Sequence, residues 1–382
     1  MGPLSGVRVL ELGSTIAGPF CGRLLADFGA DVIKIEPPEG DPVRSMGKRF
    51  HEKSLYAASI FRNKSLIVLD LRSPRGQDAA RRLAERCDVV VENFRPGGLE
   101  KWGLGYDVLS AINPGLVMIR ISGYGQTGPY GKRPGYGIIS EGMSGLRHIT
   151  GDPDRPPARV AISLTDYITG LYAAFGGVMA LFARAQTGKG QIVDAALYEC
   201  AFSFMEPHVP AYDKLGVVAN RAGSRLPGHT PNNLYATRDH QFVHIAAGSD
   251  PIFRRLASLM NRSDLLDDPR FATGVARAER EDEIDDIVAA WARTFDALDL
   301  EERLQSAEIP AGRILTMADI FRDPQYAARG MLARVPDDDL GSVTLTGVVP
   351  KLSDTPGEIR WSGRRVGQDT ERILEEIGMY AR

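Results

Sequence analysis

Segments with the composition of β-strands alternate with helical segments over the first 122 residues, and this alternation constrains the fold more than any other sequence feature. The expected strands are residues 7–12, 31–36, 66–71, 88–92 and 116–122. The expected helices are residues 19–28, 74–86 and 106–112. This order favours an α/β fold with a doubly wound, Rossmann-like parallel sheet, which takes ligands at the carboxyl ends of its strands.

The composition of the sequence changes near residue 125. Gly, Pro and Tyr are dense at residues 123–137, which is typical of a functional loop region. Residues 164–184 are apolar almost all round, so we expect a buried helix there. Residues 191–197 look like a further strand of the first domain.

A hairpin at residues 233–237 and 241–247, followed by several helices, indicates a smaller α+β domain. A chain of 382 residues suits two domains, or one large domain with an insertion. We predict a large domain whose first part is residues 1–200, a helical linker at 201–225, the small α+β domain at 226–325 and a return segment to the large domain at 326–382.

The charge pattern excludes several classes of partner. Lys and Arg number 46 and Asp and Glu number 49, which gives a formal net charge of −3 with both signs interspersed. Neither a nucleic-acid nor an anionic-membrane footprint is visible. The start of the chain has no signal pattern, and no uninterrupted apolar run reaches about 18 residues. We therefore expect a cytoplasmic protein that binds a small ligand.

Metal and nucleophilic-hydrolase chemistry find little support in the sequence. Cys21, Cys87 and Cys200 lie far apart without CxxC spacing, and the six histidines do not form HExxH, so no metal is expected. No GxSxG motif occurs, which argues against a serine hydrolase.

The loop after the first expected strand is a candidate phosphate site. Gly13 and Gly18 match the first half of a phosphate-binding P-loop, but Pro19 and Phe20 stand where Lys and Ser or Thr are required. The glycines do not form GxGxxG either. A tight turn that leads into a helix is therefore favoured over phosphate binding.

Asp166 is a single carboxylate in a long apolar stretch, and two interpretations fit it. Ser163 and Asp166 have the spacing of a capping box, with the acid in the first helical turn. The same place keeps a carboxylate ionised, as covalent catalysis at a carbonyl requires. The two roles are compatible.

Several segments, in one order over almost the whole chain, resemble the class III CoA-transferases, the family of formyl-CoA, carnitine and glutarate CoA-transferases, which is related to the α-methylacyl-CoA racemases. These segments are Leu4-x-Gly-Val-Arg-Val-Leu-Glu-Leu, Ala17-Gly-Pro, Leu25-Ala-Asp-Phe-Gly-Ala-Asp-Val-Ile-Lys-Ile-Glu, Arg62-Asn-Lys-Ser, Val91-Glu-Asn-Phe-Arg-Pro-Gly, Gly123-Tyr-Gly-Gln-Thr-Gly-Pro-Tyr and Thr187-Gly-Lys-Gly-Gln. The resemblance implies a Rossmann-like domain built from both ends of the chain, an inserted smaller domain and an interlocked homodimer. It also implies coenzyme A or acyl-CoA as substrate, a carboxylic acid as the second substrate and no permanently bound cofactor.

The resemblance further implies that Asp166 is the nucleophile, which forms mixed anhydrides and an aspartyl-CoA thioester. The positions that correspond to CoA contacts in the family are Ile16, Ala17, Leu69, Arg72, Asn93, Phe94, Arg95 and Lys101. Arg72, Arg95 and Lys101 would supply cations for the phosphates of CoA.

Three positions depart from the pattern of relatives. Ile16 stands where formyl-CoA transferase has a glutamine, and Gly137 stands where many relatives have an acid. Tyr136 stands where the racemases have a catalytic histidine. Because a phenol of pKa about 10 is a poor base for moving an α-proton, CoA transfer is favoured over racemisation. We take Tyr136 and Gly137 as candidate substrate contacts.

The expected reaction moves CoA from succinyl-CoA to a glutarate-like or itaconate-like acid. A 2-methylacyl-CoA racemase or epimerase and a non-catalytic acyl-CoA-binding protein are the alternatives. The glycine-rich loop that shields the intermediate in formyl-CoA transferase is not reproduced as a polyglycine run, and the resemblance leaves residues 223–228 as the candidate for its place.

Overall fold

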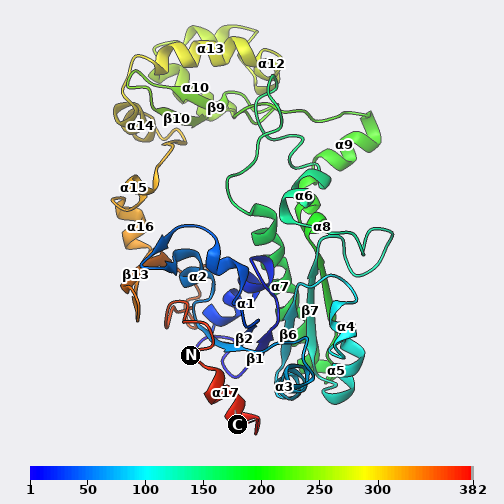
Figure 1. The fold of residues 1–382 in the computed structure, drawn as a ribbon. Coiled ribbons are helices and arrows are strands. Elements are labelled where there is room, and N and C mark those ends of the chain that lie inside the picture. The colour runs from blue at the N-terminus through cyan, green and yellow to red at the C-terminus, as the bar shows by residue number, and fades with distance from the viewer. Residues whose placement is uncertain (380–382) are drawn as a thin grey trace. The chain divides into compact units, whose positions relative to one another are not determined.

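A six-stranded parallel sheet is the core of the larger of two compact units in the structure, a computed structural model that describes residues 1–379 (Figure 1). Its strands lie in the order β5-β2-β1-β6-β7-β8. Their bounds are β1 (Arg8–Glu11), β2 (Asp31–Glu36), β5 (Lys64–Val68), β6 (Val89–Glu92), β7 (Val117–Ser122) and β8 (Ile192–Ala196). All neighbouring pairs are parallel, so the predicted α/β class with a parallel sheet is confirmed.

The strand order places a topological switch point between β1 and β6. In chain order the six strands are arranged as 3-2-1-4-5-6, and the connections leave β1 and β6 in opposite directions. In such sheets the ligand crevice lies outside the carboxyl ends of the two strands at the switch point. The segments that follow Glu11 and Glu92 therefore form its two sides.

Helices cover both faces of the sheet because alternate residues of each buried strand point to opposite faces. Leu10 and Ile33 belong to the core that also contains Leu83 of α3 (Pro74–Glu85) and Leu109 of α5 (Tyr106–Ile112). Val9 and Val32 belong to the core with α1 (Ala17–Asp27) and α7 (Leu164–Thr187) (Figure 1). Apolar side chains of β1 and β2 consequently pack on both faces of the sheet.

Shorter elements complete the unit that contains the sheet, which comprises residues 1–146, 160–217 and the chain from residue 324 onward. They are η1 (Pro42–Ser45), β3 (Arg49–Phe50), β4 (Lys53–Ser54), α2 (Leu55–Ile60), α4 (Gly98–Lys101), α6 (Gly137–Met143), α8 (Leu197–Phe202), η2 (Ser203–Met205), α9 (His208–Leu215), α16 (Pro324–Ala328), β12 (Leu332–Asp337), β13 (Gly341–Thr346) and α17 (Thr370–Glu376). Strands β12 and β13 pair as an antiparallel hairpin.

A second compact unit comprises residues 147–159 and 218–323. It holds the antiparallel sheet β11-β10-β9, with β9 (Asn232–Ala236), β10 (Phe242–Ala246) and β11 (Ala311–Arg313). Its helices are α10 (Asp250–Leu259), α11 (Asp264–Asp267), α12 (Gly274–Ala278), α13 (Glu281–Ala292), α14 (Ala297–Ser306) and α15 (Met317–Ile320). The unit has a core of its own around Phe253, Ile284 and Leu300.

Helix α7 differs from the expectation of a buried helix. Its glycines and alanines face α1 and the sheet, whereas Leu171, Phe175 and Phe182 are more than half exposed. It is also long and apolar enough, by length and composition alone, to cross a membrane, whereas no such stretch was expected from the sequence. A helix that packs one face on a sheet can have the same length and composition, so these two properties are weak evidence for a membrane span.

Candidate active site

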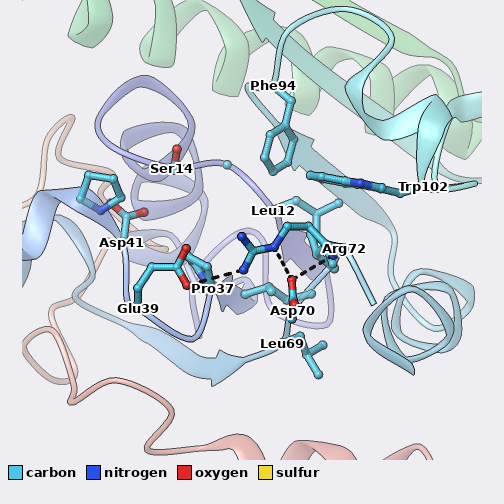
Figure 2. A pocket seen from close by; sticks show the side chains of 14 residues that line it. Leu12, Ser14, Pro37, Glu39, Asp41, Leu69, Asp70, Arg72, Phe94 and Trp102 are labelled. Atoms are coloured by element: carbon cyan, nitrogen blue, oxygen red, sulfur yellow. Dashed lines mark hydrogen bonds and ion pairs between the residues drawn. The ribbon is translucent and has the colours of Figure 1, made fainter. Parts of the chain in front are cut away.

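A pocket of about 260 Å³ lies at the switch point of the sheet (Figure 2). Leu12, Gly13 and Ser14 from the end of β1 meet Phe94 and Trp102 from the segment after β6. The rest of the wall follows β2 and β5 and consists of Ile35, Pro37, Glu39, Asp41, Pro42, Leu69, Asp70, Leu71 and Arg72. The structure thus brings together Leu69, Arg72 and Phe94 of the predicted CoA positions.

Phe94 and Trp102 give this pocket an aromatic side. Their ring centroids lie 5.2 Å apart at an interplanar angle of 84°, an edge-to-face arrangement. No sequence signal marks Trp102, because its place beside Phe94 depends on the turn of α4. Such a surface suits the flat face of a heteroaromatic ring.

Arg72 reaches across the mouth of the pocket between two carboxylates (Figure 2). Its Nε lies 2.7 Å from Asp70 and its Nη2 lies 3.8 Å from Glu39. The hydrogen bond from Arg72 lowers the pKa of Asp70 below its ordinary value. Arg72 is therefore less available to a phosphate than the sequence analysis assumed.

Arg95 and Lys101 are exposed and lie outside the pocket wall. Within residues 1–379 neither side chain has a carboxylate partner. They follow the same strand as Phe94, so they lie at the carboxyl edge of the sheet without lining the cavity.

Asn93 holds the loop that follows β1. Its Nδ2 donates to the carbonyl of Ser14 at 2.9 Å, and its Oδ1 accepts from the Ser14 N–H at 2.7 Å. A Cβ on Gly13 would lie 2.9 Å from Asn93 Oδ1 and 3.2 Å from the Cα of Gly18, so both glycines are needed for close approach. The Gly13–Gly18 pattern is explained by this tight turn.

Ile16 and Ala17 are buried and do not line the pocket. Ile16 packs with Val43 and Phe61, and Ala17 begins α1. A Cβ on Gly170 of α7 would lie 2.8 Å from the Ala17 carbonyl, so α1 and α7 touch at this point. The predicted CoA positions 16 and 17 therefore lie against the helix that carries Asp166.

Asp166 occupies the first turn of α7. No side-chain hydrogen bond caps this helix at Ser163, so the expected capping box does not form. Thr165 Oγ1 instead donates to the carbonyl of Gly137 at 2.8 Å. A Cβ on Gly137 would lie 2.9 Å from Asp166 Cγ and overlap Asp166 Oδ2, so Asp166 and Gly137 are direct neighbours.

Two tyrosines beside Asp166 were missed in the sequence. The hydroxyls of Tyr56 and Tyr167 lie 2.7 Å apart, and the Tyr167 ring packs edge-to-face on Phe20 at 4.7 Å. Burial, the Tyr167 hydrogen bond and the charge of Asp166 raise the pKa of Tyr56 well above its ordinary value. Tyr167 follows Asp166 directly, but no sequence spacing pointed to Tyr56.

Tyr136 is 72 % exposed and immediately precedes α6, without a capping hydrogen bond. Residues 223–228 belong to the second unit, where the N–H of Gly228 donates to Glu281 at 2.8 Å. Across residues 1–379, no group of three or more His, Cys, Asp or Glu side chains is arranged to hold a metal ion.

Comparison with known proteins identifies the relatives of this chain. The model of CoA-transferase family III matches residues 4–370. The chain is 48 % identical to succinyl-CoA–D-citramalate CoA-transferase of Chloroflexus aurantiacus, over 98 % of this chain and 94 % of that protein. It is 41 % identical to the β subunit of succinyl-CoA–L-malate CoA-transferase of the same organism, over 98 % and 94 % of the two chains.

A solved structure shares the fold over nearly its full length. A CaiB/BaiF family protein from Brucella suis superposes with a TM-score of 0.88 at 36 % identity, covering 98 % of this chain and 99 % of that one. Both kinds of comparison therefore extend over the sheet, the pocket and α7.

Proposed function

This chain belongs to CoA-transferase family III and is a CoA-transferase, and we propose that it moves CoA from succinyl-CoA to a small dicarboxylic acid through Asp166. The observation that carries the proposal is the carboxylate of Asp166 in the first turn of α7, against Gly137, in a chain of this family. The two relatives named for succinyl-CoA act on citramalate and malate, so dicarboxylic hydroxy acids join glutarate-like and itaconate-like acids as candidate acceptors.

The chemistry needs one carboxylate and no water. Asp166 attacks the thioester carbonyl of succinyl-CoA and expels the CoA thiolate, which leaves a succinyl–aspartyl anhydride. The thiolate attacks the aspartyl carbonyl, succinate leaves with one oxygen of Asp166, and an aspartyl-CoA thioester remains. The acceptor carboxylate repeats these two steps in reverse order, so Asp166 is regenerated and the thioester bond is conserved.

The surroundings of Asp166 support this role. The N-terminal turn of a helix favours a carboxylate over its neutral form, which keeps the nucleophile ionised. Gly137 leaves space at the carboxylate where any side chain would intrude. Tyr56 lies close enough to Asp166 for the charge of the aspartate to act on it, and the hydrogen-bonded pair of Tyr56 and Tyr167 is suited to donate to an anionic tetrahedral oxygen.

The pocket at the switch point is suited to the nucleotide part of CoA. Phe94, Trp102 and Leu69 offer an apolar wall for the adenine, and Arg95 and Lys101 offer cations at the same strand edge for the phosphates. Asn93, Ile16 and Ala17 contribute by shaping the loop between this pocket and α7.

We further propose that the second unit is an inserted domain, that two copies of the chain interlock, and that the enzyme works in the cytoplasm. The exposed apolar side chains along α7 support a second copy as the occupant of that face. The family uses CoA thioesters as substrates, and the proposed reaction calls for nothing bound permanently.

A trapping experiment tests the proposed nucleophile. Wild-type protein incubated with succinyl-CoA and hydroxylamine should give a hydroxamate on Asp166, located by mass spectrometry of the peptide that begins α7. Asp166→Asn should bind CoA in calorimetry yet form no adduct and transfer no CoA to citramalate, malate or glutarate. Full transfer activity in Asp166→Ala would refute the mechanism.

A further inference from the structure

Four buried charged side chains form a connected group beside the loop that follows β1, and we call them the loop network: Glu11, Lys34, Asp41 and Lys64. Three of these side chains are 0 % exposed, and that of Asp41 is 1 % exposed. Lys34 lies 2.9 Å from Asp41 and 3.3 Å from Glu11, and Lys64 lies 2.6 Å from Glu11. The two ammonium groups and two carboxylates compensate each other, which buried charges require.

Each end of the network binds the backbone of the loop or of the helix that follows it. Lys34 donates to the carbonyl of Gly13 at 2.6 Å, and Asp41 accepts from the N–H of Thr15 at 3.1 Å. Lys64 donates to the carbonyl of Pro19 in the first turn of α1 at 2.6 Å. Thr15 has a φ of 67°, which is unfavourable for a β-branched residue, so these bonds hold a conformation that the loop would not keep alone.

The surrounding residues are adapted to the loop network. A Cβ on Gly22 of α1 would overlap Glu11 Oε2 and lie 3.0 Å from Glu11 Cδ, which explains a glycine in the middle of a helix. The buried Glu36 accepts from the N–H of Asp41 at 2.9 Å and from Arg44 at 2.6 Å. Asp41 is thereby fixed through its backbone as well as its side chain.

The environment of Lys34 and Asp41, the pair in contact with the loop, favours the charged form of both side chains. Burial by itself would lower the pKa of Lys34, but the carboxylates of Asp41, Glu11 and Glu36 outweigh it and raise that pKa. Burial would raise the pKa of Asp41, but Lys34 and the N–H of Val43 outweigh it and lower that pKa. Both groups are charged at neutral pH.

We propose that Lys34 and Asp41 are positioning residues of the transfer reaction, which hold the backbone of Gly13 and Thr15 between the CoA pocket and the helix that carries Asp166. The inference rests on the proposed function of the chain. Gly13 lines the pocket, and the loop continues into Ala17, whose carbonyl lies against α7 at Gly170, one turn beyond Asp166. A shift of the loop would move a pocket wall and a neighbour of the nucleophile's helix together.

The chain offers a matched control at the opposite end of α1. Asp27 is a buried aspartate whose partner Arg62 is 0 % exposed, with Nη2 at 2.6 Å, and it lies in the last turn of the helix, away from the loop. Asp41→Asn and Asp27→Asn each remove one charge from a buried pair at constant volume. A purely stabilising role predicts similar losses of thermal stability and unchanged turnover in both variants.

The experiment compares steady-state kinetics with succinyl-CoA, CoA binding by calorimetry and amide hydrogen exchange of the peptide from β1 to α1. Asp41→Asn should lower kcat/KM about 10- to 100-fold and speed exchange of that peptide, whereas Asp27→Asn should change kcat/KM less than about threefold. Lys34→Met, measured in the same way, tests the carbonyl side of the loop. If Lys34→Met fails to fold, Asp41→Asn decides alone.

The kinetic and adduct measurements distinguish the positioning role from the proposed function. Equal kcat/KM for Asp41→Asn and Asp27→Asn, in a wild-type enzyme that transfers CoA, would overturn the positioning role and leave the proposed function intact. A wild-type protein that forms no Asp166 adduct would overturn the proposed mechanism. Unchanged exchange of the loop peptide in Asp41→Asn and Lys34→Met would overturn the positioning role whatever the activity.

Discussion

Gly137 lies so close to Asp166 that a single added methyl group would occupy the place of the Asp166 carboxylate. An ideal Cβ on Gly137 would overlap Asp166 Oδ2 and lie 2.8 Å from Thr165 Oγ1. This glycine is therefore part of the geometry that sets the position of the carboxylate. An acid at position 137 would require Asp166 to adopt another position.

Replacement of this glycine should impair turnover. Gly137→Ala displaces the carboxylate, so kcat with succinyl-CoA should fall about 10- to 100-fold while the Kd for CoA in calorimetry stays within about twofold. Gly142→Ala is the matched control, because Gly142 lies in the same helix α6 and a Cβ there would meet nothing within 4 Å. Equal kcat for the two variants would show that Asp166 tolerates a neighbour at position 137.

Much of the fold follows from local sequence signals. The strands of the sheet are short apolar runs bounded by turn residues, and the sequence prediction for the strand at residues 31–36 coincides with β2. The burial of α7 could not be predicted in the same way, because an apolar helix has the same sequence whether its outer face meets the same chain or another one. The exposed face of Phe175 and Phe182 is a property of one chain taken alone.

In the pocket at the switch point, the residues predicted from the sequence are ones that follow strands of the sheet. Leu69 and Phe94 come soon after β5 and β6, so the doubly wound pattern places them at one edge. Tyr56 and Trp102 reach the site through the short helices α2 and α4, whose direction depends on packing. The loop network was also invisible, because the charged residues of β1, β2 and β5 meet only when these strands pair.

Glu92 should make stability depend on pH. Burial raises its pKa from 4.5 to about 7, against the lowering effects of Arg120 and of the N–H of Phe94. Between these values the folded protein keeps a proton that the unfolded chain releases, so this contribution is complete below pH 4.5 and is lost as pH rises through about 7. The free energy of unfolding, measured in urea, should therefore fall by on the order of 3 kcal/mol as the pH rises over this range.

Two variants test whether Glu92 is the group that titrates. Glu92→Gln should abolish this fall, because an amide does not titrate. Glu100→Gln, which removes the other carboxylate on Arg120, should retain it. A fall of the same size in Glu92→Gln would assign the titration to another group.

The exposed cations after β6 should act on CoA binding rather than on turnover. Arg95→Ala and Lys101→Ala each remove a charge that has no carboxylate partner among residues 1–379. KM for succinyl-CoA should therefore rise a few-fold with unchanged kcat, and high salt should reduce the difference. Lys189→Ala is the control, because Lys189 is exposed at the opposite edge of the sheet, just before β8. If these substitutions changed kcat more than KM, the result would contradict a role in phosphate binding.

The outer face of α7 should mediate association of two chains. This face carries an apolar stripe of side chains at helical spacing that are 41–70 % exposed: Leu171, Phe175, Val178, Met179 and Phe182. The exposure of so much contiguous apolar surface to water is unfavourable, which indicates a protein partner. Wild-type protein should sediment as a dimer, and the double variant Phe175→Asp, Phe182→Asp should sediment as a monomer, because burying two carboxylates at an interface is unfavourable. Circular dichroism establishes whether the variant is folded.

A substitution on the other face of the sheet separates this effect from a general loss of solubility. Val108 is 43 % exposed on α5, which packs against the opposite core, so Val108→Asp should leave the dimer intact. A folded double variant that remains dimeric would place the interface elsewhere. A dimer that dissociates in both variants would mean that added charge, rather than the α7 face, controls association.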